Sequence, residues 1–384
     1  MKKIYNYLII IVFILSILIP LSFSDFKGGQ ISETEKRTLA QFPKIFTNDL
    51  KLATGIRSGL ENWINDNIGF RSKINRIKAI GEFHLFHISP TPLVHVGKNG
   101  WLFYTGDNNI EIGTGNYKLS HNQLESIKNN QVDIQQALKK RGIEYVIVFP
   151  PSKASIYPEY IRGNYSVGET LVDVVTNYLQ ENTTIPVINL KPDLLNAKNS
   201  KLVYFKTDTH WNEEGVYVGY CSIISRLNLL GLIHSSPDKV SKYSSVHLGD
   251  LSIMMDVDLP PESFIITQLV NKDSIKIEGG QYYDQLSKLT KEDGVQNGFY
   301  SYQNSSARKI RVLIFGDSFF GSLTMIELLA ENFSGVDFIW SYNITNNTID
   351  SVKPNIVIFE MTERYIPYME QFTSTFVNST TANP

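Results

Sequence analysis

Ile310-Arg311-Val312-Leu313-Ile314-Phe315-Gly316-Asp317-Ser318 is a strong β pattern that stops abruptly at a glycine, and the apolar spacing of a helix follows over about 319–331. A serine on such a strand-to-helix turn lies at the carboxyl edge of a sheet. The amides at the start of the helix lie beside it and can stabilise an oxyanion. Ser318 is therefore our candidate nucleophile.

The chain from about residue 120 alternates between short apolar strands and amphipathic helices. This alternation is typical of a parallel, three-layer α/β sheet with helices on both faces. Residues 234–306 interrupt it with Pro260-Pro261 and Gly279-Gly280, and we interpret them as a region inserted near the site. The strands expected from the pattern are residues 145–149, 186–190, 312–315, 338–342 and 355–359.

Asp208-Thr209-His210-Trp211-Asn212 supplies the other groups that a hydrolytic site needs. Residues two apart on an extended backbone project to the same side, so the Asp208 carboxylate can hold one imidazole nitrogen of His210. Asn212 is a candidate N-cap for a helix over 213–228. A serine nucleophile needs a base, and the base needs a carboxylate that fixes its tautomer, whatever their order in the chain. We therefore predict a triad of Ser318, His210 and Asp208.

Two other interpretations of these motifs stay open. Asp208 can simply cap the helix, with His210 an ordinary loop histidine and Gly316-Asp317-Ser318 an ordinary turn. Asp208 and His210 can also ligate a metal, although no other dense group of His, Asp or Glu stands out in the sequence to complete a coordination shell. We expect neither a metal nor a cofactor.

Taken together, these motifs resemble those of the AlgX/AlgJ group of SGNH-hydrolase-like proteins and the related DHHW proteins. Ordinary SGNH esterases place Gly-Asp-Ser early and separate the Asp from the His by two residues. Here the serine comes late and one residue separates Asp208 from His210, which matches the AlgX/AlgJ group and favours acyl transfer over simple hydrolysis. The matching residues are 208–212 and 316–319, with support from Gly100-Trp101-Leu102-Phe103-Tyr104, Gly249-Asp250-Leu251 and Glu360-Met361-Thr362-Glu363-Arg364.

The resemblance implies an O-acetyltransferase that modifies a secreted or surface polysaccharide. Ser318 would accept the acetyl group, His210 would move the proton, and Asp208 would orient His210. The resemblance also implies a partner, a polytopic membrane-bound O-acyltransferase that passes acetyl groups across the membrane. A carbohydrate acetylesterase and a non-catalytic polysaccharide-binding or assembly protein with the same fold are the alternatives.

Three residues are candidates for substrate binding. Lys153 follows the first strand of the α/β pattern, at the sheet edge where such proteins bind ligands, and the resembled family has a lysine near this place. An exposed structural lysine is the alternative. Arg364 follows the last strand, where a salt bridge with Glu360 or Glu363 is as good an interpretation as substrate contact. Trp211, next to His210, is the third candidate.

The amino terminus has the pattern of a membrane segment. Lys2-Lys3 precede an apolar stretch over about 7–23, which is near the lower limit for spanning a bilayer. A signal peptide shares this pattern, but no clear cleavage site with small residues follows, so we favour a single-pass anchor. Lysines on the amino-terminal flank keep that end in the cytoplasm, which places the catalytic domain outside the cell membrane.

Composition bounds the remaining possibilities. The chain has 384 residues, of which 42% are hydrophobic and 19% charged, so it can bury a large core. A net charge of −2 argues against a nucleic-acid partner. The single cysteine, Cys221, cannot form an internal disulfide. We expect an anchor or signal peptide over 1–24, a tether over 25–49, a helical and hairpin lead-in over 50–119, the SGNH-like domain over 120–365 and a tail over 366–384.

Overall fold

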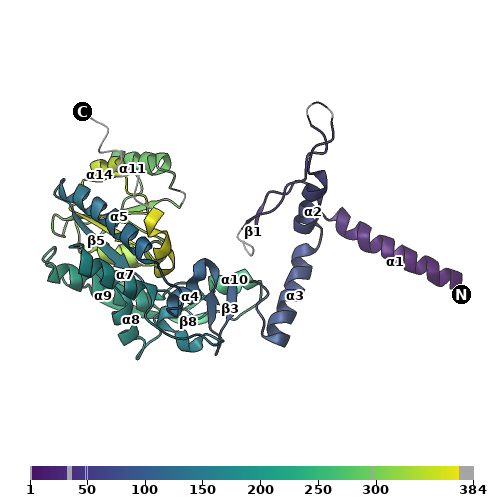
Figure 1. Ribbon diagram of the computed structural model, residues 1–384, viewed down its shortest axis with the longest axis horizontal. Helices are drawn as coiled ribbons and strands as arrows, with labels where there is room; N and C mark the ends of the chain where they lie inside the picture. The colour runs from purple at the N-terminus through teal and green to yellow at the C-terminus, as the bar shows by residue number, and fades with distance from the viewer. Residues whose placement is uncertain (1, 33–36, 48, 50, 296, 372–384) are drawn as a thin grey trace. The chain divides into compact units, whose positions relative to one another are not determined.

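The computed structural model describes residues 2–32, 37–47, 49, 51–295 and 297–371 (Figure 1). The chain divides into two compact units. Unit 1 lies within Met1–Val96 and Asp250–Pro260, and unit 2 lies within Gly97–Gly249 and Pro261–Pro384.

Unit 1 begins with a long apolar helix, α1 (Lys2–Ser22). Its segment Tyr5–Ser22 has a mean hydropathy of 2.2 and none of it is buried, so α1 is long and apolar enough to cross a membrane. The other elements of unit 1 are β1 (Ile31–Ser32), β2 (Arg37–Thr38), α2 (Ile56–Asn67), α3 (Arg71–Phe86), β3 (Val94–Val96) and α10 (Asp250–Met255).

The end of α1 is fixed to the turn between α2 and α3. The amide of Gly69 donates to the carbonyl of Pro20 at 3.1 Å. Close by, the ring centroids of Phe23 and Phe70 lie 4.9 Å apart. The apolar helix is therefore continuous with the folded part of unit 1 through both backbone and side-chain contacts.

The segment expected as a tether, residues 25–49, contacts α2 over part of its length. Arg37 forms a bidentate ion pair with Asp66 at 2.6 and 2.7 Å. The indole of Trp63 donates to the carbonyl of Asp25 at 2.9 Å. These contacts attach the start and the middle of the expected tether to one helix.

A seven-stranded sheet forms the centre of unit 2, in the order β6-β5-β13-β11-β12-β10-β9. The first five strands are parallel, as the alternating pattern predicted. β10 and β9 join antiparallel, so the sheet is mixed. These two strands come from the region expected as an insertion, where turn residues and serines obscured a strand pattern. The strands are β5 (Glu144–Phe149), β6 (Val187–Asn189), β9 (Ile275–Lys276), β10 (Phe299–Gln303), β11 (Arg311–Phe315), β12 (Gly335–Ile339) and β13 (Ile356–Glu360). Unit 2 also contains a short strand, β4 (Leu102–Tyr104). Its helices are η1 (Gly106–Asn108), α4 (Asn109–Gly113), α5 (His121–Lys139), α6 (Lys153–Ile156), η2 (Pro158–Tyr160), α7 (Leu171–Asn182), α8 (Lys191–Ala197), α9 (Glu213–Leu229), α11 (Gln281–Glu292), α12 (Ser318–Gly321), α13 (Met325–Ala330), α14 (Asn346–Val352) and η3 (Glu363–Gln371).

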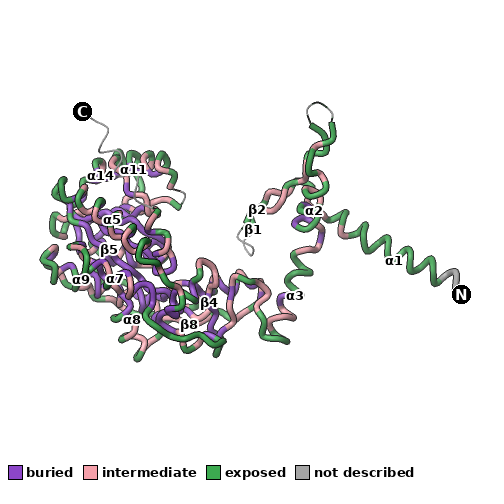
Figure 2. Tube along the Cα trace, in the orientation of Figure 1, coloured by how far each residue is buried: buried purple, intermediate pink, exposed green. Residues whose placement is uncertain are grey.

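The two faces of this sheet bury alternate residues of each strand. On β11, Val312 and Ile314 pack in a cluster with residues of α9 and α13. Leu313 and Phe315 pack in the other cluster, with residues of α5 and α7. Figure 2 shows the buried residues gathered along the strands. The sheet with helices on both faces gives the three layers that the sequence predicted.

A hairpin outside the central sheet carries residues that matter for the site. β7 (Val240–His247) and β8 (Glu262–Leu269) are antiparallel along their whole length, with His247 opposite Glu262 at its open end. The hairpin packs on α9, where Thr267 donates to Glu213 at 3.2 Å. The region expected as an insertion over 234–306 thus supplies this hairpin as well as β9, β10 and α11.

Several expected boundaries differ from the structure. A single helix was expected over 319–331, but the structure has two shorter helices, α12 and α13. The helix is interrupted between Gly321 and Met325, where the Thr324 hydroxyl donates to Glu213. The part of the expected tail that the structure describes is helical, and it buries Ile366 and Met369 in the core. Residues 372–384 lie outside the described part of the chain.

Candidate active site

Ser318 is the first residue of α12, directly after the turn that ends β11. The Asp317 carboxylate caps this helix, accepting from the Phe319 amide at 2.8 Å. Gly316 is required by close approach, since an added Cβ would lie 2.3 Å from the Glu360 carboxylate. The serine therefore occupies the strand-to-helix turn that the sequence predicted.

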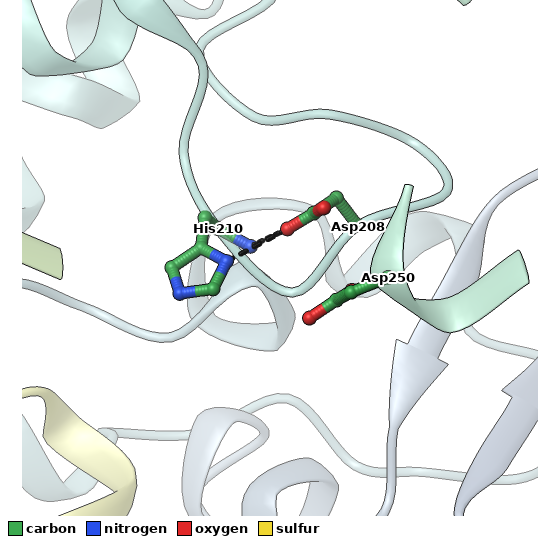
Figure 3. Close-up of side chains that lie close together, drawn as sticks. All are labelled: Asp208, His210 and Asp250. Carbon is green, nitrogen blue, oxygen red and sulfur yellow. Dashed lines mark hydrogen bonds and ion pairs between the residues drawn. The ribbon is translucent and has the colours of Figure 1, made fainter. Parts of the chain in front are cut away.

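His210 lies between Ser318 and Asp208. Its Nε2 atom is 2.9 Å from the Ser318 hydroxyl oxygen, and its Nδ1 atom is 2.8 Å from Asp208 Oδ1. Figure 3 shows the contact of the imidazole with Asp208. The His210 amide also donates to the same carboxylate oxygen at 2.9 Å. The structure thus brings the three predicted triad residues into one hydrogen-bonded chain, and a metal on His210 would have to replace one of these two ring contacts.

Asp250, which Figure 3 also draws, belongs to unit 1 by its position in the chain. Ser318, His210 and Asp208 belong to unit 2.

Lys153 is buried, so the alternative of an exposed structural lysine is wrong. Only 2% of the residue is accessible. Its ammonium donates to the carbonyls of Phe205, Lys206 and Asp208, at 3.3, 3.0 and 2.6 Å. A buried cation needs such partners, and here they belong to the loop that carries the predicted triad acid. Lys153 therefore holds this loop in place.

Trp211 is also unsuited to the substrate contact that we predicted. The residue is fully buried. Its indole N–H donates to the carbonyl of Phe319 at 3.0 Å, and the two rings lie 5.4 Å apart. Trp211 thus joins the loop of His210 to the helix of Ser318.

Arg364 is 6% accessible, and its guanidinium is surrounded by aromatic rings. The guanidinium carbon lies 4.7 Å from the ring centroid of Tyr365, 5.6 Å from that of Phe319 and 5.9 Å from that of Tyr104. Among the described residues, neither Glu360 nor Glu363 forms an ion pair with it. The expected salt-bridged cluster is therefore replaced by cation–π contacts next to the nucleophile turn.

The two glutamates of the Glu360–Arg364 segment are buried and accept hydrogen bonds from backbone amides near the site. Glu360 accepts from the Asp317 amide at 2.8 Å. Burial, reinforced by the Asp317 carboxylate, raises the pKa of Glu360 well above its ordinary value. Glu363 accepts from the amides of Ser152 and Val172, at 2.9 and 3.0 Å. Both side chains fix turns at the carboxyl ends of strands.

Two residues of the hairpin were not predicted as part of the site. His247 Nε2 lies 2.8 Å from Asp208 Oδ2, and Glu262 accepts from the amides of Lys206 and Thr207 at 2.8 and 3.0 Å. His247 comes 39 residues after Asp208 and just before the Gly249-Asp250-Leu251 motif, which does not include it, so no local pattern pointed to it. Only the pairing of β7 with β8 places these residues together.

Comparison with known proteins gives this geometry a context. Residues 94–280 match the family described as "SGNH hydrolase-like domain, acetyltransferase AlgX". The probable alginate O-acetylase AlgJ of Pseudomonas putida is 22% identical over 316 residues, which cover 77% of this chain and 76% of that protein. Its counterpart in Pseudomonas aeruginosa is 31% identical over 138 residues, but the match spans only 35% of this chain and 32% of that protein.

A solved structure supports the fold. Bacillus cereus PatB1 aligns with a TM-score of 0.52 at 17% identity, over 72% of this chain and 98% of that protein. At this identity the likeness concerns the fold alone, whereas the sequence matches concern the family. The chain is thus similar to the AlgX/AlgJ group of SGNH-hydrolase-like acetyltransferases, and the family match over residues 94–280 covers just under half of its length.

Proposed function

We propose that this protein O-acetylates a surface or secreted polysaccharide through an acetyl-Ser318 intermediate. The observation that carries the proposal is the hydrogen-bonded chain from Ser318 through His210 to Asp208. This arrangement gives a serine both a base that can remove its proton and a carboxylate that orients the base.

In the first half-reaction, the Ser318 oxygen attacks the carbonyl carbon of an acetyl donor and its proton moves to Nε2 of His210. Asp208 accepts the Nδ1–H and stabilises the imidazolium. The Ser318 amide, at the start of α12, would donate to the oxyanion. The intermediate then expels the leaving group, which takes the proton from His210, and the acetyl ester of Ser318 remains.

In the second half-reaction, a sugar hydroxyl gives its proton to His210 and attacks the acetyl-Ser318 carbonyl. The ester bond to serine breaks, the serine oxygen regains the proton, and the acetylated sugar leaves. The curated relatives are named alginate O-acetylases, which supports a polysaccharide acceptor. Water in place of the sugar would make the protein an acetylesterase.

The membrane is the second part of the proposal. The apolar segment of α1 and the Lys2-Lys3 pair at its amino-terminal end support a single-pass anchor with the catalytic unit outside the cell membrane. Acetyl groups would then reach Ser318 from a polytopic membrane-bound O-acyltransferase. Lys153 and Trp211 would take part by holding the site. Arg364, whose guanidinium lies against the ring of Phe319, stays our candidate for substrate contact.

The test uses the full chain in detergent with an activated acetyl ester and an acceptor oligosaccharide. Transfer to the oligosaccharide and acetate release are measured for wild type and Ser318→Ala, and we expect the variant to lose at least about three orders of magnitude in rate. Ser322→Ala, an exposed serine one turn later, is the matched control and should behave as wild type. Acetate release without transfer would favour an esterase, and turnover that persists in Ser318→Ala would exclude the acetyl-serine mechanism.

A further inference from the structure

We propose that His247 is a positioning residue that holds the second oxygen of Asp208 and so fixes the orientation of His210. The kinetic consequences of this inference rest on the proposed function. The contacts from which it is argued are independent of that function. The contact that carries the inference is the one from His247 to the Asp208 carboxylate, through which it would act on His210.

The Asp208 carboxylate is buried, with 5% of the residue accessible. Its Oδ1 atom accepts from the amide and from Nδ1 of His210, at 2.9 and 2.8 Å. Its Oδ2 atom lies 2.8 Å from His247 Nε2, which must carry a proton to donate to a carboxylate. Contacts on both oxygens set the plane of the carboxylate, so His247 resists the rotation that would turn Oδ1 away from His210.

His247 is itself held by its surroundings. Its ring stacks on Phe205 with a centroid distance of 4.0 Å and an interplanar angle of 25°. On another side, the ring of Phe264 lies at 6.0 Å and 72°. Its ring position is therefore set by packing before any substrate binds.

Another residue of the hairpin also binds the loop of residues 205–208. Glu262, opposite His247 in the β7–β8 pairing, accepts from the amides of Lys206 and Thr207 and from the Thr207 hydroxyl at 2.6 Å. Lys153 donates to carbonyls of this loop. The backbone of residues 205–208 is thus fixed through its amides and carbonyls, and His247 adds the contact to the carboxylate itself.

The substitution series separates the hydrogen bond from the bulk of the ring. In His247→Gln, the side-chain amide places an N–H donor at about the position of Nε2. In His247→Asn the side chain is too short for its donor to reach Asp208, and His247→Ala has no donor. We expect kcat to fall about 10- to 100-fold in the Ala and Asn variants with KM unchanged, because a small misplacement of the base costs about that much. The Gln variant should stay within about threefold of wild type. His234→Ala, an exposed histidine of unit 2, is the matched control.

A second readout is independent of turnover. The proton of His210 Nδ1, held by Asp208, gives a far-downfield proton NMR resonance in wild type, which His210→Ala identifies. We expect this resonance to be lost or broadened in His247→Ala and kept in His247→Gln, in the full chain in detergent. If Ser318→Ala shows that the protein is no acyltransferase, the resonance still decides the role of His247. The proposal would be overturned if His247→Ala kept the wild-type kcat and the resonance. It would also be overturned if the Gln and Ala variants lost kcat and the resonance to the same extent.

Discussion

Single residues in this site are placed by buried polar contacts rather than by surface chemistry. Lys153 shows this most clearly, because its ammonium serves three carbonyls of one loop. From the sequence, a lysine after a strand at the ligand-binding edge predicted substrate contact. The sequence could not show that the side chain folds inward, since that depends on where the loop of Asp208 passes.

Replacement of this lysine by methionine should destabilise the protein. Lys153→Met keeps the length of the apolar stem but leaves the carbonyls of Phe205, Lys206 and Asp208 without their donor. We expect the free energy of unfolding to fall by about 3 kcal/mol, measured by urea denaturation. Lys98→Met, an exposed lysine that donates to the Glu159 carbonyl at 3.0 Å, should change it by less than about 0.5 kcal/mol. Equal effects of the two substitutions would refute the scaffold role of Lys153.

Glu360 should make stability depend on pH. Because its pKa is raised in the folded protein, the folded state keeps a proton that the unfolded chain has already lost. The free energy of unfolding therefore falls as the pH rises from the ordinary glutamate value toward the raised one. Glu360→Gln cannot titrate, so its stability should fall less over that window. Urea unfolding at a series of pH values checks this, and parallel curves for the two proteins would argue against a raised pKa.

At the scale of elements, the start of α9 positions the base. Asn212 caps this helix two residues after His210, accepting from the Gly215 amide at 3.0 Å, and its side-chain amide donates to the Leu202 carbonyl at 2.9 Å. The cap was predicted from the sequence, because Asn before an apolar periodic run is a strong local signal.

Removal of the cap gives a test at this scale. Asn212→Ala should lower the free energy of unfolding by about 1–2 kcal/mol, because the Gly215 amide and the Leu202 carbonyl lose their partners. Asn212→Asp keeps the acceptor for Gly215 and should recover roughly half of the loss. Thermal unfolding followed by circular dichroism measures both. No difference between the Ala variant and wild type would mean that solvent replaces the cap without cost.

The elements also show where prediction from sequence stops. Strong periodicity gave β5, β11 and β13 within about two residues, since buried parallel strands read as apolar runs. β10 reads Phe-Tyr-Ser-Tyr-Gln and lies toward the sheet edge, so its polar residues hid it. For the site, local patterns indicated Ser318, His210 and Asp208. His247 and Glu262 were missed because a long-range hairpin pairing brings them there.

At the scale of the whole molecule, α1 is attached to folded structure rather than to a free linker. The contact of Gly69 with Pro20 fixes where the chain leaves the apolar helix. If α1 spans a membrane as we propose, this attachment limits how far unit 1 can move from the membrane surface.

Removal of α1 should change the location of the protein and not its chemistry. A chain that begins at Asp25 should appear in the soluble fraction after cell lysis, whereas the full chain should stay with membranes after an alkaline wash. Both should show the same rate of the proposed acetylation in detergent, since Ser318, His210 and Asp208 lie in unit 2. Mature protein whose amino terminus begins after residue 24 would instead identify α1 as a cleaved signal peptide.

The indole of Trp211 is an intrinsic fluorescent probe of this site. Its N–H is bonded to the carbonyl of the residue after Ser318, so its emission depends on the electric field and geometry around the nucleophile. The chain has four tryptophans, and phenylalanine in place of Trp63, Trp101 and Trp340 would leave Trp211 as the single emitter. Acetylation of the serine could then be followed by intrinsic fluorescence with any donor, including one that releases no coloured product.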